Sequence, residues 1–215
     1  MRSLSATLLA AQKAAAPTPY VPVEARNTVC GVVRYDWERL YTGSEADYFH
    51  AVTIPADGSM TRVRITPPAD SRKLYRQRVA SPGPGSDFSQ WTYCDQYNVV
   101  AVSAGSLGAE VSIFWVKSDR AIYRMKSTDY GVNWGSPELL GYTPTTAING
   151  LASSYKSNGD IALFFADQAT LYVMKYTGGS WGEPAAWGKS TGDLSGVATV
   201  YSSDWNLLVT GKDSG

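Results

Sequence analysis

The chain is poor in the residues that build metal centres and acid–base sites. Among its 215 residues it has one histidine, His50, and two cysteines, Cys30 and Cys94. The cysteines lack the spacing of a zinc site or a redox motif, and they fit either one disulfide or two free buried thiols. His50 lies in an apolar strand pattern without a partner nucleophile, which favours a structural role. The sequence therefore predicts no metal site and no histidine-based triad.

An excess of charge of one sign and long apolar runs are also missing. Nineteen basic and nineteen acidic residues leave a formal net charge of zero, and no block of like charge stands out. This balance argues against nucleic acid or an anionic membrane as the main partner. No apolar run reaches the roughly 18 residues of a membrane-spanning helix. Glycine-rich nucleotide-binding motifs and the zinc-protease motif are absent as well, so we expect no cofactor.

Aromatic residues and an internal repeat are what the chain has in abundance. Aromatics make up 12% of the residues, and a short strand pattern occurs three times, with Tyr75, Tyr123 and Tyr172 spaced 48 and 49 residues apart. The Trp-Gly-x-Pro sequence at Trp134 returns at Trp181, 47 residues later. A period near 50 residues in a chain of short strands is typical of β-propeller blades. We expect most of the aromatic side chains to pack within the blades.

Strand patterns bounded by turn signals, among them the hairpin turn Asp57-Gly58, divide the repeat into blades of four antiparallel strands. The predicted strands are 48–54, 60–66, 73–79 and 89–94 in blade one; 98–105, 110–118, 121–128 and the segment after Trp134 in blade two; 150–156, 160–166, 170–176 and the segment after Trp181 in blade three; and 196–202 and 205–211 in a fourth. The sequence thus predicts an all-β propeller with about four blades in this chain. Either strands at 29–43 complete the fourth blade and close a small ring, or the chain is the front part of a larger, six- or seven-bladed ring. The chain stops at Gly215, where a third strand is due, which favours the second alternative.

The first 27 residues have a different pattern. Residues 4–16 are rich in alanine and leucine and predict one short helix, which Pro17 ends. We therefore expect a helix and a proline-rich extended arm over 1–27, and a propeller over 28–215 that is incomplete at its C-terminus if the chain is a fragment. A single helix has no core of its own, so we expect it to dock on a protein partner, and a homo-oligomer is left open.

One motif carries a family resemblance. After the third strand of blade two, residues 127–134 read S-T-D-Y-G-V-N-W, which is the pattern S-x-D-x-G-x-x-W. This pattern resembles the Asp-box of the bacterial neuraminidase repeat, which sialidase-like propellers carry. Asp129 is expected to accept backbone N–H bonds, Gly131 to take a positive φ, Trp134 to cover the turn and Ser127 to add a hydroxyl bond. Because the Asp-boxes of this family lie on the outer rim, the resemblance implies a structural role for these four residues.

The resemblance also implies what a sialidase would require of this chain. Such an enzyme needs three arginines that hold the substrate carboxylate, an acid aspartate, and a tyrosine nucleophile activated by a glutamate. The family's arginine motif has its nearest match at Arg64-Ile65-Thr66-Pro67, which carries an extra Thr66 and has Val63 in place of an aromatic residue. No tyrosine–glutamate pair can be singled out. We therefore predict no catalytic residues, with an exo-glycosidase whose remaining catalytic residues lie beyond Gly215 as the alternative.

The predicted function is a non-catalytic propeller that binds a glycan or a cell surface, or that has a structural role. The helix, the proline-rich arm and the β-rich body resemble tail or fibre proteins of bacteriophages, which implies an extracellular or virion-associated location. Recognition of a glycan would use aromatic residues near predicted strand ends, and Tyr142, Trp187 and Tyr201 are the candidates. A purely architectural protein-docking platform is a further alternative.

Overall fold

The computed structural model describes residues 49–83, 86, 90–142, 144, 148–189, 193–201 and 205–212. The predicted helix, the proline-rich arm and the strands predicted at 29–43 lie outside these ranges. The chain divides into two compact units, and every described strand belongs to the unit formed by residues 45–82 and 86–215. Apart from the short 3₁₀ helix η2 (Pro68–Asp70), all regular elements of the described part are β-strands. The all-β prediction is therefore confirmed, and no helix in the described part is long and apolar enough to cross a membrane.

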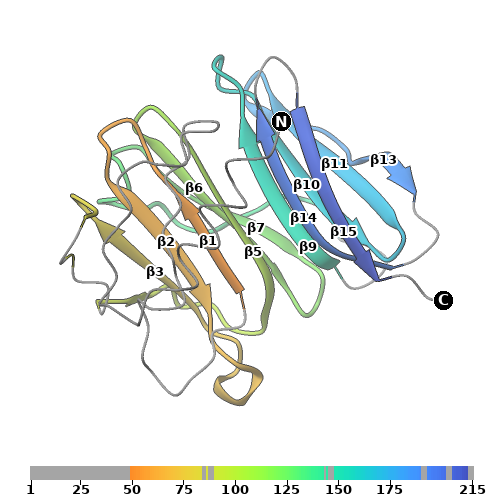
Figure 1. Cartoon of the computed structure of the whole chain (residues 1–215), viewed down its shortest axis with the longest axis horizontal. Coiled ribbons are helices and arrows are strands. Elements are labelled where there is room, and N and C mark those ends of the chain that lie inside the picture. The colour runs from red at the N-terminus through yellow and green to blue at the C-terminus, as the bar shows by residue number, and fades with distance from the viewer. Residues whose placement is uncertain are drawn as a thin grey trace, which may run out of the picture. The chain divides into compact units, whose positions relative to one another are not determined.

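The described strands form four antiparallel sheets, each built from strands that are consecutive in the sequence (Figure 1). The first sheet has β1 (Phe49–Thr53), β2 (Met60–Ile65), β3 (Leu74–Val79) and β4 (Thr92–Tyr93). The second has β5 (Val99–Leu107), β6 (Glu110–Lys117), β7 (Ile122–Ser127) and β8 (Glu138–Leu139). The third has β9 (Ile148–Tyr155), β10 (Ile161–Asp167), β11 (Thr170–Thr177), β12 (Ser180–Trp181) and β13 (Ala185–Lys189). The fourth has β14 (Asp193–Tyr201) and β15 (Trp205–Lys212).

These sheets match the predicted blades. The first and second sheets contain the four strands predicted for blades one and two, in the orders β1-β2-β3-β4 and β5-β6-β7-β8. The third sheet differs at its outer edge, where the segment that begins at Trp181 gives two short strands, β12 and β13, and both pair with β11. Pro184 stands between them and has no N–H to donate to a ladder, which accounts for the interruption. The fourth sheet contains both strands predicted for it.

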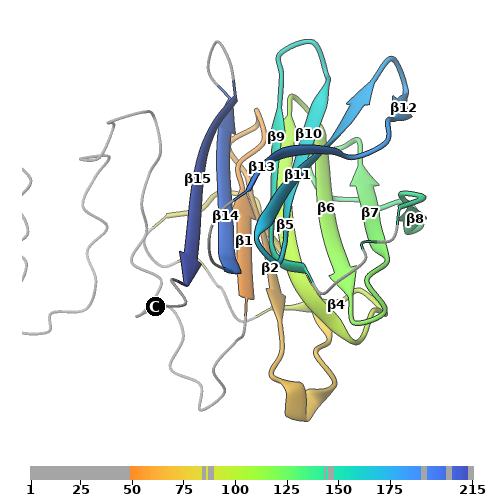
Figure 2. The same ribbon diagram turned by 90° about the vertical axis from the view of Figure 1, so that its right-hand side faces the viewer.

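The first strand of each sheet lies against the first strand of the next, so that β1, β5, β9 and β14 follow one another. Two hydroxyl pairs connect these strands. Thr53 Oγ1 lies 2.7 Å from Ser106 Oγ, and Ser103 Oγ lies 2.8 Å from Ser153 Oγ. The short strands β8 and β12 occupy the opposite edges of their sheets (Figure 2). Four-stranded sheets that follow one another through contacts of their first strands are the arrangement of propeller blades.

Apolar clusters fill the contacts between neighbouring sheets, and two of them concern the first three sheets. We call the contact of the first and second sheets the first junction, and the contact of the second and third sheets the second junction. Strand β6 serves both, because alternate residues face opposite sides: Trp115 lies in the cluster of the first junction and Phe114 in that of the second. Both side chains are fully buried. Burial of a side chain such as Phe114 stabilises a fold by roughly 1.5–3 kcal/mol, so the two junctions are major sources of stability.

Candidate functional site

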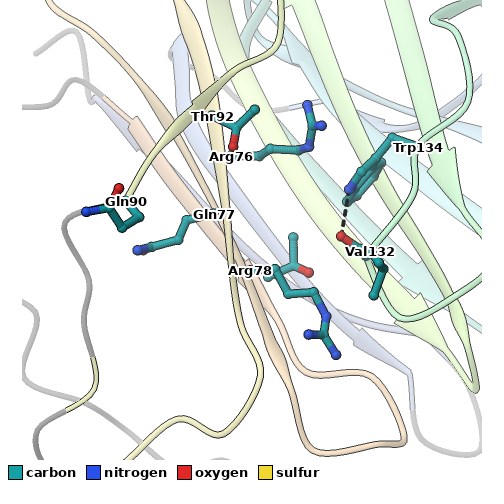
Figure 3. A pocket seen from close by; sticks show the side chains of 9 residues that line it. Arg76, Gln77, Arg78, Gln90, Thr92, Val132 and Trp134 are labelled. Atoms are coloured by element: carbon teal, nitrogen blue, oxygen red, sulfur yellow. Dashed lines mark hydrogen bonds between the residues drawn. The ribbon is translucent and has the colours of Figure 1, made fainter.

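The first junction contains a cavity of about 350 Å³ (Figure 3). Its walls come from β2, β3 and β4 of the first sheet and from the turn that follows β7 of the second. The lining residues are Thr61, Arg76, Gln77, Arg78, Gln90, Thr92, Gly131, Val132 and Trp134. The first sheet therefore supplies polar side chains, and the turn supplies one aromatic ring.

The arginines of β3 reach the cavity because of strand alternation. Arg76 and Arg78 are two positions apart, so they share the face of the first sheet that is turned toward the second. The pairing of β2 with β3 places Thr61 opposite Arg78 on the same face. Gln77 lies between the two arginines in sequence, and in Figure 3 it extends with Gln90 to the side of β3 away from Trp134. The cavity thus has a guanidinium end and an amide end.

The opposite wall is the turn at residues 127–134, which two side chains hold together. The Ser127 hydroxyl donates to Asp129 Oδ1 (2.7 Å) and accepts the backbone N–H of Gly131 (2.9 Å). Asp129 also accepts the backbone N–H of Asn133 (2.8 Å) and its side-chain amide (2.6 Å). These bonds, with that of Ser127 first, hold the pKa of Asp129 below its ordinary value of 3.8. The turn is therefore well ordered, while its membership of the Asp-box family stays a prediction.

Gly131 and Trp134 bring this turn close to the first sheet. Gly131 has a φ of +81°, and a Cβ at this position would lie 2.8 Å from Thr61 Oγ1, so the site requires glycine on both counts. The Trp134 indole N–H donates to the Gly131 carbonyl (2.8 Å, dashed in Figure 3). The ring held in this way lies beside the Arg76 guanidinium, whose central carbon is 5.4 Å from the ring centroid. At this distance the cation and the ring attract each other.

The two cavity arginines differ in their partners. Arg78 donates from Nε to the Tyr130 carbonyl (2.7 Å) and from Nη2 to the Asp57 carboxylate (2.9 Å). Arg76 donates from Nη1 to the Cys94 sulfur (3.5 Å), and no carboxylate in the described part of the chain pairs with it. Burial raises the pKa of the Cys94 thiol against the opposing effect of Arg76, so the sulfur is neutral at neutral pH. Among the described residues, therefore, no counter-charge pairs with Arg76.

A hydroxyl of the cavity also lacks a partner. Thr61 is 1% exposed, and its Oγ1 makes no hydrogen bond to any described residue. A buried hydroxyl left without a hydrogen bond costs roughly 1–3 kcal/mol. The cavity thus combines an indole ring with a guanidinium that pairs with no carboxylate of the described residues. This combination suits a polar ligand that also has an apolar face.

The aromatic residues predicted to bind a ligand lie elsewhere. Tyr142 is half-buried against the cluster of the second junction, with its ring centroid 5.7 Å from that of Phe165. Trp187 is 48% exposed and meets Phe164 edge-on at 5.5 Å. Neither lines the cavity. Tyr201 ends β14, and its side chain lies outside the described part, so a ligand-binding role for these three residues stays a prediction.

The histidine and the cysteines are placed as follows. His50 lies in β1 opposite Arg64, within the strand predicted for it, and its side chain is outside the described part. Cys94 is a free, buried thiol, and Cys30 lies outside the described residues. Within the described ranges no group of three histidine, cysteine, aspartate or glutamate side chains is arranged to hold a metal ion.

The sequence analysis did not identify the arginines of β3 as cavity residues. The signal was present in the repeat. Arg76 and Arg124 each follow a repeated tyrosine, and Trp134 and Trp181 come 58 and 57 residues after them. Arg124 also lies beside the ring of its tryptophan, at 5.9 Å. An arginine of one blade beside a tryptophan of the next is therefore a property of the repeat.

Comparison with known proteins gives a fold relationship. No protein-family model matches the chain, and no curated protein matches its sequence. Among solved structures, a mutant of Aleuria aurantia lectin in complex with alpha-methyl-L-fucoside is similar, with a TM-score of 0.51 and 15% identity over 77% of this chain and 53% of the lectin chain. The same mutant in complex with Fucα1-6GlcNAc gives a TM-score of 0.51 and 14% identity over 77% of this chain and 54% of that chain. A mercury-derivative form of the fucose-specific lectin from Aleuria aurantia gives a TM-score of 0.51 and 15% identity over the same shares, 77% and 54%.

The likeness to the lectin concerns the fold alone at this level of identity. It agrees with the sheet topology and supports a propeller-like arrangement of the antiparallel sheets. This chain spans about half the length of the lectin chains that it matches.

Proposed function

We propose that this protein is a non-catalytic glycan-binding protein and that the cavity of the first junction is its sugar site. The observation that carries the proposal is the Arg76–Trp134 pair that lines the cavity. An indole ring packs against the apolar face of a pyranose, while guanidinium and hydroxyl groups bond to the sugar oxygens. The volume of about 350 Å³ is at the lower end of the range of about 300–1,000 Å³ for small-molecule sites.

Two further observations support sugar binding. The chain shares its fold with a lectin that is described as fucose-specific. A shared fold is only an analogy for function, so this support counts together with the cavity and not without it. The turn at 127–134 supports a place among sialidase-like propellers. A role in a virion rests on the sequence alone and stays a prediction.

The second candidate is an exo-glycosidase of the sialidase type, which the Asp-box-like turn favours. Most glycosidases act through a pair of carboxyl groups, and sialidases use a tyrosine nucleophile. The residues that line the cavity are arginine, glutamine, threonine, glycine, valine and tryptophan, so an enzyme would take these groups from elsewhere. A fluorogenic sialoside assay separates the two functions. If wild type hydrolyses the sialoside faster than buffer and Arg76→Met does not, the glycosidase replaces the non-catalytic binding protein as the proposed function.

The first test of the proposal is a glycan array probed with the folded protein, displayed multivalently because single sugar contacts are weak. Wild type is compared with Arg76→Met and with Lys126→Ala, which removes a positive charge from an exposed position outside the cavity. We expect selective binding that Arg76→Met abolishes and Lys126→Ala leaves unchanged, with circular dichroism verifying the fold of each variant. A blank array from folded wild type contradicts glycan binding and favours an architectural docking platform.

A further variant, Trp187→Ala, tests an aromatic residue that the sequence predicted to bind a ligand. Its side chain is 48% exposed. If the cavity is the sugar site, this variant binds like wild type. Loss of binding in Trp187→Ala with full binding in Arg76→Met moves the site to the third sheet.

A further inference from the structure

The two junctions are built on the same strand register, so their residues correspond. In the first sheet, Val63 of β2 lies opposite Arg76, and Thr61 comes two positions before Val63. In the second sheet, Phe114 of β6 lies opposite Arg124, and Ser112 comes two positions before Phe114. Arg76 therefore corresponds to Arg124, and the Thr61 hydroxyl to the Ser112 hydroxyl.

At the second junction the guanidinium has a carboxylate partner and a hydroxyl partner. Arg124 is 2% exposed, and it donates from Nη2 to Glu110 Oε1 (2.7 Å) and from Nε to Ser112 Oγ (2.9 Å). The Tyr155 hydroxyl donates to the same carboxylate oxygen (3.2 Å). The Trp181 ring lies beside the guanidinium. One carboxylate and one hydroxyl thus satisfy an arginine that rests on an indole ring.

At the first junction the same place holds no carboxylate. The residue that corresponds in register to Glu110 is Ser59, one position before β2. Its short side chain is buried and donates to Asp57 Oδ1 (2.7 Å) instead of reaching an arginine. Arg76 has no carboxylate partner among the described residues, and Thr61 Oγ1 has no hydrogen bond to any of them. The carboxylate that pairs with Arg124 thus has no counterpart at Arg76 among the described residues, and Arg76 lines the cavity.

We propose that the cavity binds an acidic sugar, whose carboxylate takes at Arg76 the place that Glu110 takes at Arg124. The proposal rests on the proposed glycan-binding function and names the class of its ligand. A carboxylate accepts charge-assisted bonds from a guanidinium, so it supplies the counter-charge that Arg76 lacks among the described residues. The sugar ring then lies against Trp134.

Arg76 is the arginine of the cavity that determines which charge on a ligand is favourable. Arg78 is paired with the Asp57 carboxylate, so the two charges largely cancel. Arg62, on the opposite face of the first sheet, donates to the Gln77 side chain (3.1 Å). A neutral sugar would leave the charge of Arg76 without a counter-ion, whereas a carboxylate compensates it.

The test compares sugars that differ only in their acidic group. The probes are multivalent glucuronic acid against glucose, galacturonic acid against galactose, and N-acetylneuraminic acid against its methyl ester. Apparent affinity is measured on immobilised wild type by biolayer interferometry. We expect at least one acid to bind about 10- to 100-fold more tightly than its neutral partner, which is the effect of losing a hydrogen bond to a charged group.

Variants assign the preference to the cavity. Arg76→Met is expected to reduce the acid to the affinity of its neutral partner, and Arg76→Lys to restore part of the preference, since it keeps the charge and loses the fork of donors. Thr61→Val keeps the shape of the side chain and removes a hydroxyl that is buried, so it is expected to leave the preference for the acid intact. Lys126→Ala is the charge-matched control and leaves the preference intact.

The outcomes separate this inference from the function on which it rests. Equal binding of acids and neutral partners, both lost in Arg76→Met, overturns the acidic ligand and leaves the sugar site standing. A preference for acids that persists in folded Arg76→Met overturns the assignment to this cavity. Binding of no probe and a blank array overturn both proposals.

Discussion

The first and second junctions contain the same arginine–tryptophan pair in two different states. At the second junction Arg124 is 2% exposed and bonded to a carboxylate, and aromatic rings surround it. At the first junction Arg76 is half-buried beside a cavity of about 350 Å³. The register of the strands is the same, and the main difference is Glu110 against Ser59. If the cavity binds the proposed ligand, the exchange of one acceptor between two copies of the repeat has turned a packing unit into a binding site.

The turns that carry the two tryptophans differ as well. The Trp134 indole N–H donates to Gly131 O, whereas the Trp181 indole N–H is buried and has no acceptor among the described residues. The turn before Trp181 runs through Thr177–Ser180 and has no counterpart of Asp129. Trp181 instead packs edge-on against Phe114, at 5.9 Å. The ring that borders the cavity is thus fixed by its own turn, and the ring of the closed junction is fixed by the core.

The largest expected effect comes from removing the carboxylate of the closed junction. Glu110→Ala leaves the buried Arg124 guanidinium without a counter-charge, and we expect the free energy of unfolding to fall by about 3–5 kcal/mol. Arg76→Met removes a cation that has no carboxylate partner, so we expect a change of less than about 1 kcal/mol. Urea unfolding of both variants measures the difference. Equal losses would mean that the two arginines are equivalent and would break the comparison.

The next effect concerns the close approach of the turn to the first sheet. Gly131→Ala combines a strained φ with a Cβ 2.8 Å from Thr61 Oγ1, and we expect a loss of about 2–3 kcal/mol together with loss of sugar binding. Gly179→Ala, in the corresponding turn of the third sheet, has a φ of +90° and open space around its Cβ. This control should lose only the backbone contribution, about 1–2 kcal/mol. Thermal or urea unfolding gives both values, and identical losses would show that the contact with Thr61 is unimportant.

A pair of hydroxyl deletions should change stability in opposite directions. Thr61→Val removes an unsatisfied buried hydroxyl, so we expect the free energy of unfolding without ligand to rise by about 1 kcal/mol. Ser112→Ala removes an acceptor of the buried Arg124, so we expect it to fall by about 1 kcal/mol or more. Urea unfolding in ligand-free buffer decides between them. A loss of stability in Thr61→Val would show that its hydroxyl has a partner in solution.

The sequence predicts the sheets better than the cavity, and the reason is physical. Strands such as β6 and β10 follow from local apolar runs and turn glycines, which were sufficient to predict the blades. The division of the outer strand of the third sheet depends on Pro184, and the strand prediction did not resolve it. The cavity depends on long-range contacts, among them the approach of Gly131 to Thr61, which lie in different blades. The contrast between Ser59 and Glu110 becomes visible only when the strand registers are known.

The smallest expected effect is a pH dependence confined to the turn of the first junction. The Ser127 hydroxyl and the Asn133 amides hold the pKa of Asp129 below its ordinary value of 3.8, so the folded state favours the carboxylate. A lowered pKa adds stability that is present above the ordinary value and is lost as the pH falls through the lower, folded-state value. The stability difference between wild type and Asp129→Asn should therefore be constant from neutral pH to about pH 5 and shrink below it.

Urea unfolding of both proteins from about pH 7 to about pH 2 measures this difference. The turn of the third sheet has no such carboxylate, so Gly179→Ala should differ from wild type by the same amount at every pH. A gap for Asp129→Asn that stays unchanged down to the lowest pH would show that Asp129 does not hold the turn through its charge.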